Sequence, residues 1–261
     1  NPSSTHAIGR SSKSILENCR KEIASIFKVS AAEIIFTSGG TEADNLILNS
    51  CVRDLKVTRI ITSKIEHHAV LHAIEELSLN YNLNVNYVNL DANGMIDYNH
   101  LDKLLNDNSS KTLVSLMHVN NEIGNRIDLK KVADLCKENN ALFHSDTVQS
   151  VGHYNLNFSE IPIDFAAVAA HKFHGPKGVG FAFIRKNSGL KPLIVGGQQE
   201  RGLRAGTESV YAIAGLNKAL QISYSNLEKE MEYIKSIKNY FKDRLLQEIP
   251  NSKLNGYCGD D

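Results

Sequence analysis

Short apolar runs alternate with segments of helical periodicity along most of the chain. The runs are typical of buried strands, and they are Glu33–Thr37, Arg59–Thr62, Val85–Leu90, Thr112–Met117, Ala141–Ser145 and Asp164–Ala169. The segments between most of them have the spacing of amphipathic helices, and they are Thr41–Leu55, Ala69–Leu79, Tyr98–Leu105 and Leu129–Glu138. This alternation predicts an α/β fold in which a mainly parallel sheet is covered by helices on both faces.

The pattern changes after the last of these runs. Gly178–Arg185 and Pro192–Val195 are predicted as two more strands, at least one of them antiparallel, which makes the sheet mixed. From Glu208 to Ile249 the chain has helical periodicity, and we expect two helices with a break near Ser223–Asn226. Pro250 and Gly256 indicate a linker. Residues 1–250 are therefore predicted to form one large domain, and residues 251–261 to begin a smaller C-terminal domain that is largely missing.

Composition excludes some classes of partner. The 261 residues are 42% hydrophobic, and 29 Lys and Arg balance 29 Asp and Glu. A net charge of zero gives no reason to expect a nucleic acid or an acidic membrane as partner. No apolar run approaches the roughly 20 residues that span a bilayer. The chain begins at Asn1-Pro2, with neither Met nor the pattern of a signal peptide, and it stops in a polar turn. We expect that both ends are cut from a longer protein.

The four cysteines are widely spaced. Cys19, Cys51, Cys136 and Cys258 form no C-x-x-C pair, which favours reduced thiols and a cytoplasmic location over a disulfide or zinc framework. Cys51 and Cys136 have apolar neighbours in predicted helices, so we expect both to be buried.

Polar residues with catalytic potential follow the predicted strands. They are Gly39-Gly40-Thr41, Glu66-His67-His68, His118 to Glu122, Asp146 and Lys172. Ligands of open α/β sheets bind beyond the carboxyl ends of the strands. We therefore expect these residues to gather at one edge of the sheet.

Asp146 and Lys172 have the chemistry that pyridoxal phosphate requires. A lysine forms a Schiff base with the aldehyde of this cofactor, and an acid pairs with its pyridinium nitrogen. A single lysine after a strand is usually a solvated surface residue, so the assignment depends on the other residues that converge on it.

Ser38-Gly39-Gly40-Thr41-Glu42 follows a strand and opens a helix. Backbone N–H groups at a helix N-terminus, together with a threonine hydroxyl, can hold a phosphate. The alternative is an ordinary N-cap formed by Ser38 or Thr41. The segment matches neither the Walker P-loop nor the dinucleotide pattern G-x-G-x-x-G.

His67, His68 and His72 have two possible roles. His68 and His72 are four residues apart on a helix, but a third metal ligand is lacking and the pattern is not H-E-x-x-H, so no metal site is predicted. One histidine could instead stack on a flat cofactor ring, or the group could line a polar rim.

Asn121 could donate to a phenolate or carboxylate, or be a turn residue. The loop from Gln198 to Glu208 could bind an anion or a partner protein through its arginines, or it could be a solvated loop.

Seven of these segments together resemble one family. They are Asn1 to His6, Ser38 to Glu42, Glu66 to Val70, His118 to Gly124, Asp146 to Ser150, His171 to Lys177 and Arg201 to Thr207. They occur in this order in cysteine desulfurases of the NifS/IscS type, and the resemblance covers essentially the whole chain. It implies fold type I of the pyridoxal phosphate enzymes, the aminotransferase class V branch, and a homodimer.

The resemblance also implies roles for individual residues. Lys172 is similar to the Schiff-base lysine, Asp146 to the acid on the ring nitrogen, and His67 to the stacked histidine that also transfers protons. Gln149 and Asn121 match residues that bind the phenolic oxygen or the substrate. Phosphate contacts are implied for Gly40, Thr41 and His171, and Thr207 matches a threonine that reaches the phosphate of the other subunit.

The implied activity converts L-cysteine to L-alanine and leaves the sulfur on an enzyme cysteine as a persulfide, which passes to an iron–sulfur scaffold or another acceptor. Two features depart from the family. Ala169 stands where a phosphate-binding serine is usual, and no cysteine of this chain has the Ser/Gly-rich context of the family's nucleophile. The family's arginine for the substrate carboxylate is also absent. A selenocysteine lyase, an aminotransferase, or a non-catalytic scaffold that keeps the fold are the alternatives.

Overall fold

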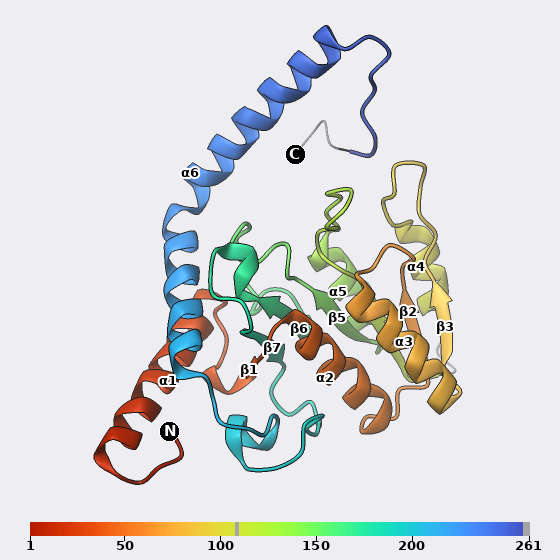
Figure 1. Cartoon of the computed structure of the whole chain (residues 1–261). Helices are drawn as coiled ribbons and strands as arrows, with labels where there is room; N and C mark the ends of the chain where they lie inside the picture. Colours follow the sequence, from red (N-terminus) through yellow and green to blue (C-terminus); the bar gives the residue numbers. More distant parts are fainter. Residues whose placement is uncertain (108–109, 258–261) are drawn as a thin grey trace.

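A seven-stranded sheet runs through the residues that this computed structural model describes, 1–107 and 110–257 (Figure 1). Its strands are β1 (Ile34–Thr37), β2 (Arg59–Thr62), β3 (Asn84–Tyr87), β4 (Thr112–Ser115), β5 (Leu142–Asp146), β6 (Phe165–Ala169) and β7 (Gly180–Ile184). Their order across the sheet is β1-β7-β6-β5-β4-β2-β3. The predicted runs therefore became strands, with ends that differ by a few residues.

Only β7, among the described strands, runs against its neighbours. It pairs antiparallel with both β1 and β6, whereas the remaining adjacent pairs are parallel. The mainly parallel, mixed sheet is confirmed. As a consequence, β1, β2, β4, β5 and β6 all end at the same edge, and the loops that follow them lie close together.

Helices cover both faces of the sheet, as predicted. The longer helices are α1 (Ala7–Ile26), α2 (Gly40–Arg53), α3 (His68–Tyr81), α4 (Tyr98–Leu105), α5 (Leu129–Glu138) and α6 (Val210–Glu248). Three short 3-10 helices are η1 (Ala31–Glu33), η2 (Ala170–Phe173) and η3 (Gln199–Gly202). One hydrophobic cluster joins α2 and α3 to one face of the sheet, and another joins α1, α4, α5 and the first part of α6 to the other face.

Alternation along each strand divides the apolar side chains between the two clusters. On β1, Ile34 and Phe36 pack in the α1 cluster, and Ile35 packs in the α2 cluster. On β6, Val168 and Phe165 are divided in the same way. Each such side chain stabilises the fold by about 1.5–3 kcal/mol through burial, which explains why the strands of this sheet have continuous apolar runs.

Helix α6 corrects the prediction of two helices with a break near Ser223–Asn226. It is continuous from Val210 to Glu248. Ser225 and Asn226 donate side-chain hydrogen bonds to the carbonyl of Ile222, at 2.8 and 3.1 Å. Polar residues that bond to the preceding turn in this way are tolerated inside a helix.

Pro192–Val195 is not a strand, contrary to the prediction. The carbonyls of Lys191 and Pro192 accept hydrogen bonds from Ser50 (2.8 Å) and Arg53 (3.2 Å) of α2, so this backbone is bonded to a helix instead of a sheet edge.

The sequence analysis also assigned no element to the segment that forms α1. His6 caps this helix by accepting a hydrogen bond from the Gly9 amide at 3.2 Å, an unusual cap that does not stand out in the sequence.

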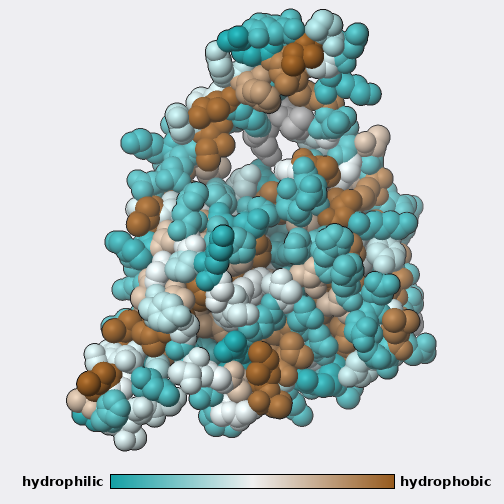
Figure 2. All heavy atoms as spheres, in the orientation of Figure 1, coloured by the Kyte–Doolittle hydropathy of each residue, from teal (hydrophilic) through white to brown (hydrophobic). Residues whose placement is uncertain are grey.

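The second half of α6 extends beyond the sheet (Figure 1). Its exposed large side chains include Tyr233, Ile234, Tyr240 and Phe241, each between 58% and 66% exposed. Apolar surface is visible on this projecting part in Figure 2. The predicted boundary near residue 250 lies just after this helix and remains a prediction.

Candidate functional site

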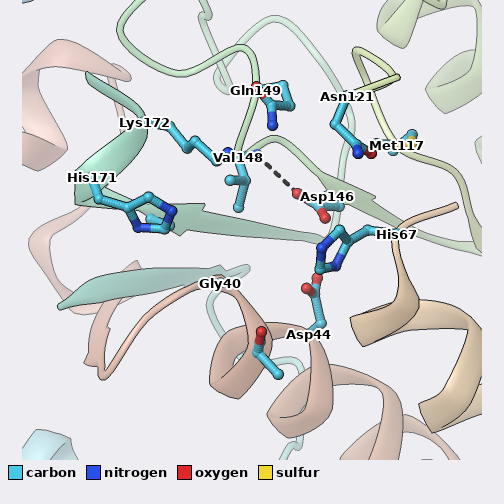
Figure 3. A pocket seen from close by; sticks show the side chains of 12 residues that line it. Gly40, Asp44, His67, Met117, Asn121, Asp146, Val148, Gln149, His171 and Lys172 are labelled. Atoms are coloured by element: carbon cyan, nitrogen blue, oxygen red, sulfur yellow. Dashed lines mark hydrogen bonds between the residues drawn. The ribbon is translucent and has the colours of Figure 1, made fainter. Parts of the chain in front are cut away.

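A cavity of about 280 Å³ lies at the carboxyl edge of the sheet. It is lined by Gly40, Thr41, Asp44, His67, Met117, Asn121, Asp146, Val148, Gln149, Ala169, His171 and Lys172. Apart from Thr207, every residue predicted to bind the cofactor lines it. The structure thus brings together side chains from loops that follow five different strands (Figure 3).

Two glycines form the start of α2. Gly39 has a φ of 152°, which side chains disfavour, and a Cβ added to Gly40 would lie 2.7 Å from Cγ2 of Val148. Gly39 is the N-cap, and no side chain caps the helix. The alternative in which Ser38 or Thr41 is the cap is therefore wrong. The first-turn N–H groups are left for another acceptor, as a phosphate site requires.

Asp146 ends β5 in a buried position. Its Oδ1 accepts a hydrogen bond from the Val148 amide at 2.9 Å. The pKa of the Asp146 carboxyl is raised to about 7. Burial is the main cause, and the neighbouring Asp44 carboxyl contributes to the same increase. A cation placed against this carboxyl would favour its charged form.

Lys172 follows β6 within η2, and its side chain extends toward the cavity (Figure 3). The carbonyl of Lys172 is 2.9 Å from Nε2 of His153, which donates to it. His174 ends the turn in the left-handed conformation, with a φ of 64°. These contacts hold the backbone of Lys172 while its side chain remains exposed. The sequence analysis had not found the part played by His153.

His67 is the N-cap of α3. Its Nδ1 accepts a hydrogen bond from the Ala69 amide at 3.1 Å, so Nε2 of the neutral ring carries the proton. The loop before it is bound to the end of β4 in two places. Glu66 accepts from the Met117 amide at 2.8 Å, and Asn120 donates to the Ile65 carbonyl at 2.6 Å. These two buried residues position His67 and Asn121, and neither role was predicted.

His68 and His72 lie beside each other, with ring centroids 4.8 Å apart, and both are exposed. Within the described residues, no group of three or more His, Cys, Asp or Glu side chains is placed to hold a metal ion.

Thr207 is exposed and does not line the cavity of the single chain. It lies in the loop before α6. Arg204 of the same loop binds Glu42 of α2 at 2.8 and 3.1 Å, and Glu42 in turn accepts from the Ser38 amide at 2.9 Å. The loop from Gln198 to Glu208 is therefore attached to the predicted phosphate cradle.

Asp44 is a cavity residue that the sequence analysis missed. It lies four residues after Gly40 on α2, so it shares a face of the helix with the cradle, and it is 1% exposed. Burial raises its pKa to about 8. One feature of the sequence could have identified Asp44. It is an acidic residue on a helix face whose other members, Ala43, Ile47 and Leu48, are apolar and pack in the core.

Comparisons with known proteins agree with this geometry. The family described as aminotransferase class-V matches residues 1–259. The chain belongs to this family. A cysteine desulfurase IscS from Dictyoglomus turgidum is 41% identical over 261 residues, which cover 98% of this chain and 65% of that protein. The chain therefore spans about two thirds or less of the length of such relatives.

Two solved structures share the fold. A NifS-like protein has a TM-score of 0.91 at 37% identity, over 95% of this chain and 68% of that one. SspA in complex with cysteine has a TM-score of 0.79 at 33% identity, over 85% of this chain and 64% of that one. The fold is type I of the pyridoxal phosphate enzymes, and the resemblance to cysteine desulfurases is confirmed.

The cavity fits the cofactor that this family uses, pyridoxal phosphate. An uncapped helix start built on two glycines suits a phosphate group, and a Cβ on Gly40 would collide with Val148 on the cavity wall. A buried carboxyl and an amine lie on the same cavity, as a pyridinium aldehyde requires. Ala169, 1% exposed, lines the wall where a serine hydroxyl would give the phosphate one more donor.

Proposed function

We propose that the whole protein is a pyridoxal phosphate-dependent cysteine desulfurase. It converts L-cysteine to L-alanine and transfers the sulfur to one of its own cysteines as a persulfide. The observation that carries this proposal is that Lys172 and Asp146 line the same cavity. It is supported by the 41% identity to a cysteine desulfurase over 98% of the present chain. The cysteine complex of SspA supports L-cysteine as the substrate.

When bound, pyridoxal phosphate supplies an aldehyde that condenses with amines and a ring that withdraws electrons from the substrate Cα. Lys172 would hold the aldehyde through its amine, and the same amine, on the cavity wall, could take a proton from the substrate. Asp146 holds the proton on the ring nitrogen. Its position at a strand end and its bond from Val148 orient the carboxyl toward the cavity.

The remaining cavity residues orient the cofactor and the substrate. His67 would lie against the ring, with a proton on Nε2 that it could move. Asn121 and Gln149 bind the phenolic oxygen or the substrate carboxylate. Gly40, Thr41 and His171 bind the phosphate, at the helix start where the dipole favours an anion.

The sulfur-accepting thiol is proposed to lie outside the described cysteines. Cys19, Cys51 and Cys136 are free, buried, and not on the cavity. Burial raises the pKa of all three thiols, which disfavours the reactive thiolate. Cys258 lies outside the described residues. The persulfide is then delivered to an iron–sulfur scaffold protein or another sulfur acceptor.

The active form is proposed to be a homodimer in which Thr207 reaches the phosphate of the partner subunit. The segments on either side of Thr207 expose large apolar side chains, Val195 at 79% and Tyr211 at 86%. Surfaces of this kind are typical of oligomer interfaces. Light scattering should give a dimer at micromolar concentration, and Tyr211→Asp should weaken it. A wild-type monomer that binds the cofactor normally would contradict this part of the proposal.

The cytoplasmic location is also a proposal, based on the free thiols. Within residues 1–107 and 110–257, none of the helices combines the length and the apolar character needed to cross a lipid bilayer.

The test of the activity uses the intact protein loaded with pyridoxal phosphate. L-cysteine with a reductant should yield equal amounts of alanine and sulfide, and Lys172→Ala should abolish both. Alanine from L-selenocysteine alone would favour a selenocysteine lyase. Amino transfer to a 2-oxo acid without sulfide would favour an aminotransferase, which needs no thiol. Absence of cofactor binding would favour a non-catalytic scaffold.

A further inference from the structure

A chain of buried polar side chains lies behind Asp146. The hydroxyl Oγ of Ser115, on β4, is 2.9 Å from Nδ1 of His144 on β5. On its other side, Nε2 of His144 is 3.3 Å from Oδ1 of Asp44 on α2. All three side chains are at most 1% exposed. Since Asp44 lines the cavity, these three side chains connect the inside of the sheet to the wall of the candidate site.

The hydrogen bonding of these three side chains is incomplete within the described residues. Neither Oδ1 of Asp44 nor Nε2 of His144 has a well-formed hydrogen bond, although the two atoms lie 3.3 Å apart. Buried polar atoms of this kind are rare and call for an explanation. A proton shared between the two atoms would satisfy both.

Two arrangements of protons satisfy the three side chains. Burial lowers the pKa of His144 to about 4, so the imidazole is neutral and carries one proton. If Asp44 is ionised, Nε2 of His144 donates to Asp44 and Nδ1 accepts from Ser115. If Asp44 is protonated, its O–H donates to Nε2, and Nδ1–H donates to the Ser115 oxygen. The two arrangements differ by one proton and by the tautomer of His144.

The surrounding charges select between these arrangements. The Asp44 carboxyl raises the pKa of Asp146, and both carboxyls raise the pKa of the buried Glu66 in the same region. Glu66 already accepts from Ser63 and Met117. His144 is neutral, and His67 is the other titratable side chain that acts on Asp146. Several neighbouring buried carboxyls do not all ionise together, so when one of them carries a charge the others hold protons.

We propose that Asp44, His144 and Ser115 are positioning residues, in which a protonated Asp44 donates to Nε2 of His144 so that Asp146 is the carboxyl that carries the negative charge. This inference rests on the proposed function and deepens it, because it says how the chain assigns the charge to the side chain that meets a cationic ring nitrogen. Asp146 suits this task, since it has a backbone donor, the Val148 amide, which Asp44 lacks.

The decisive measurement is the tautomer of His144 in the full chain without cofactor, labelled with ¹⁵N-histidine. His144→Gln identifies the signal by its loss. At pH 6.5 to 7 we expect the proton on Nδ1. Raising the pH through about 8, where Asp44 titrates, should move it to Nε2. Asp44→Asn should keep the Nδ1–H form at every pH, because its amide donates to Nε2 without titrating. An Nε2–H signal at neutral pH, or a wild-type tautomer that does not respond to pH, would overturn the proposal.

A second measurement separates a positioning role from a merely structural one. In the presence of pyridoxal phosphate, Asp44→Asn should change cofactor affinity by about threefold or less, since a neutral amide replaces a neutral acid. Asp146→Asn should weaken it about tenfold or more, because a charged hydrogen bond is lost. Equal losses in the two variants would show that Asp44 is charged and would refute the assignment. If no cofactor binds at all, the proposed function fails, while the tautomer measurement still stands by itself.

Discussion

Two buried clusters of ionisable side chains differ in how completely their hydrogen bonds are satisfied. In one, the guanidinium of Arg20 forms two 2.7 Å bonds to Glu200 and a 2.6 Å bond to the Ile34 carbonyl, and Glu200 also accepts from the Phe36 amide at 2.8 Å. In the other, Asp44 and His144 each keep an atom without a well-formed hydrogen bond. The first cluster is complete without any ligand.

The difference indicates what each cluster does. Arg20 and Glu200 attach α1 and the loop before α6 to β1, and they hold Glu200 in a left-handed conformation, with a φ of 47°. A positive φ at a residue other than glycine costs free energy, and the surrounding contacts must compensate for it. The Asp44 cluster borders a cavity, and a proton shared between Asp44 and His144 would satisfy it beside the candidate site. Stability and function are therefore assigned to different buried ionisable groups.

The largest expected effect is at the cavity and leaves the fold intact. Lys172→Ala removes the amine that holds the cofactor, so borohydride reduction of the loaded protein should fix no cofactor, whereas peptide mapping of the wild type should find it on Lys172. Because the side chain is exposed, the melting temperature should change little. Lys177→Ala, in the same exposed turn, is the matched control and should still be labelled at Lys172. Labelling of another lysine in the wild type would disprove the assignment.

Breaking the Arg20–Glu200 cluster should instead lower the stability of the fold. Arg20→Met leaves Glu200 buried without its partner, and we expect a loss of about 3–5 kcal/mol in the free energy of unfolding, measured by urea denaturation. Lys130→Met, which breaks an exposed pair with Asp134, should cost less than about 1 kcal/mol. Similar costs for the two variants would show that the buried pair does not hold the loop.

The incomplete cluster should make stability depend on pH. Burial raises the pKa values of Asp44 and Glu66 to about 8 and of Asp146 to about 7. Between about pH 4, where such acids titrate in an unfolded chain, and pH 8, the folded chain binds more protons. The stability of the cofactor-free chain should therefore be highest near pH 4 on account of these groups and decrease as the pH rises through 7 to 8.

Asp146→Asn should flatten this decrease, because an amide does not titrate. Denaturant midpoints at pH 5 and pH 8 measure it. Should the variant and the wild type lose the same stability between these two values, Asp146 would not have a raised pKa in the folded chain.

The smallest of these effects concerns Ala169. Ala169→Ser would place a hydroxyl on the cavity wall beside the start of α2, where a phosphate is expected. A hydrogen bond to a charged group contributes about 1.5–3 kcal/mol, so cofactor affinity should rise about tenfold or more, as measured by absorbance titration. Ala170→Ser, at the next position and not on the cavity, serves as the control. An unchanged affinity in Ala169→Ser would place the phosphate elsewhere.

The sequence by itself determined the sheet, most of its helices, and most of the site. Continuous apolar runs separated by helical periods require a parallel sheet between helices, and in such a sheet the residues after each strand meet at one edge. For this reason the sequence alone assigns Gly40, His67, Asp146 and Lys172 to a common site. The motif order then indicated the family.

Tertiary structure alone decided the contacts between segments that are distant in the sequence. No local pattern shows that Asp44 faces His144, that Glu200 pairs with Arg20, or that Asn120 is bonded to the loop before His67. The same holds for Pro192–Val195, which has a strand-like pattern but is bonded to α2, and for α6, which continues through the polar residues Ser223–Asn226. Burial and pairing set the charge of a buried acid, and both depend on which elements pack together.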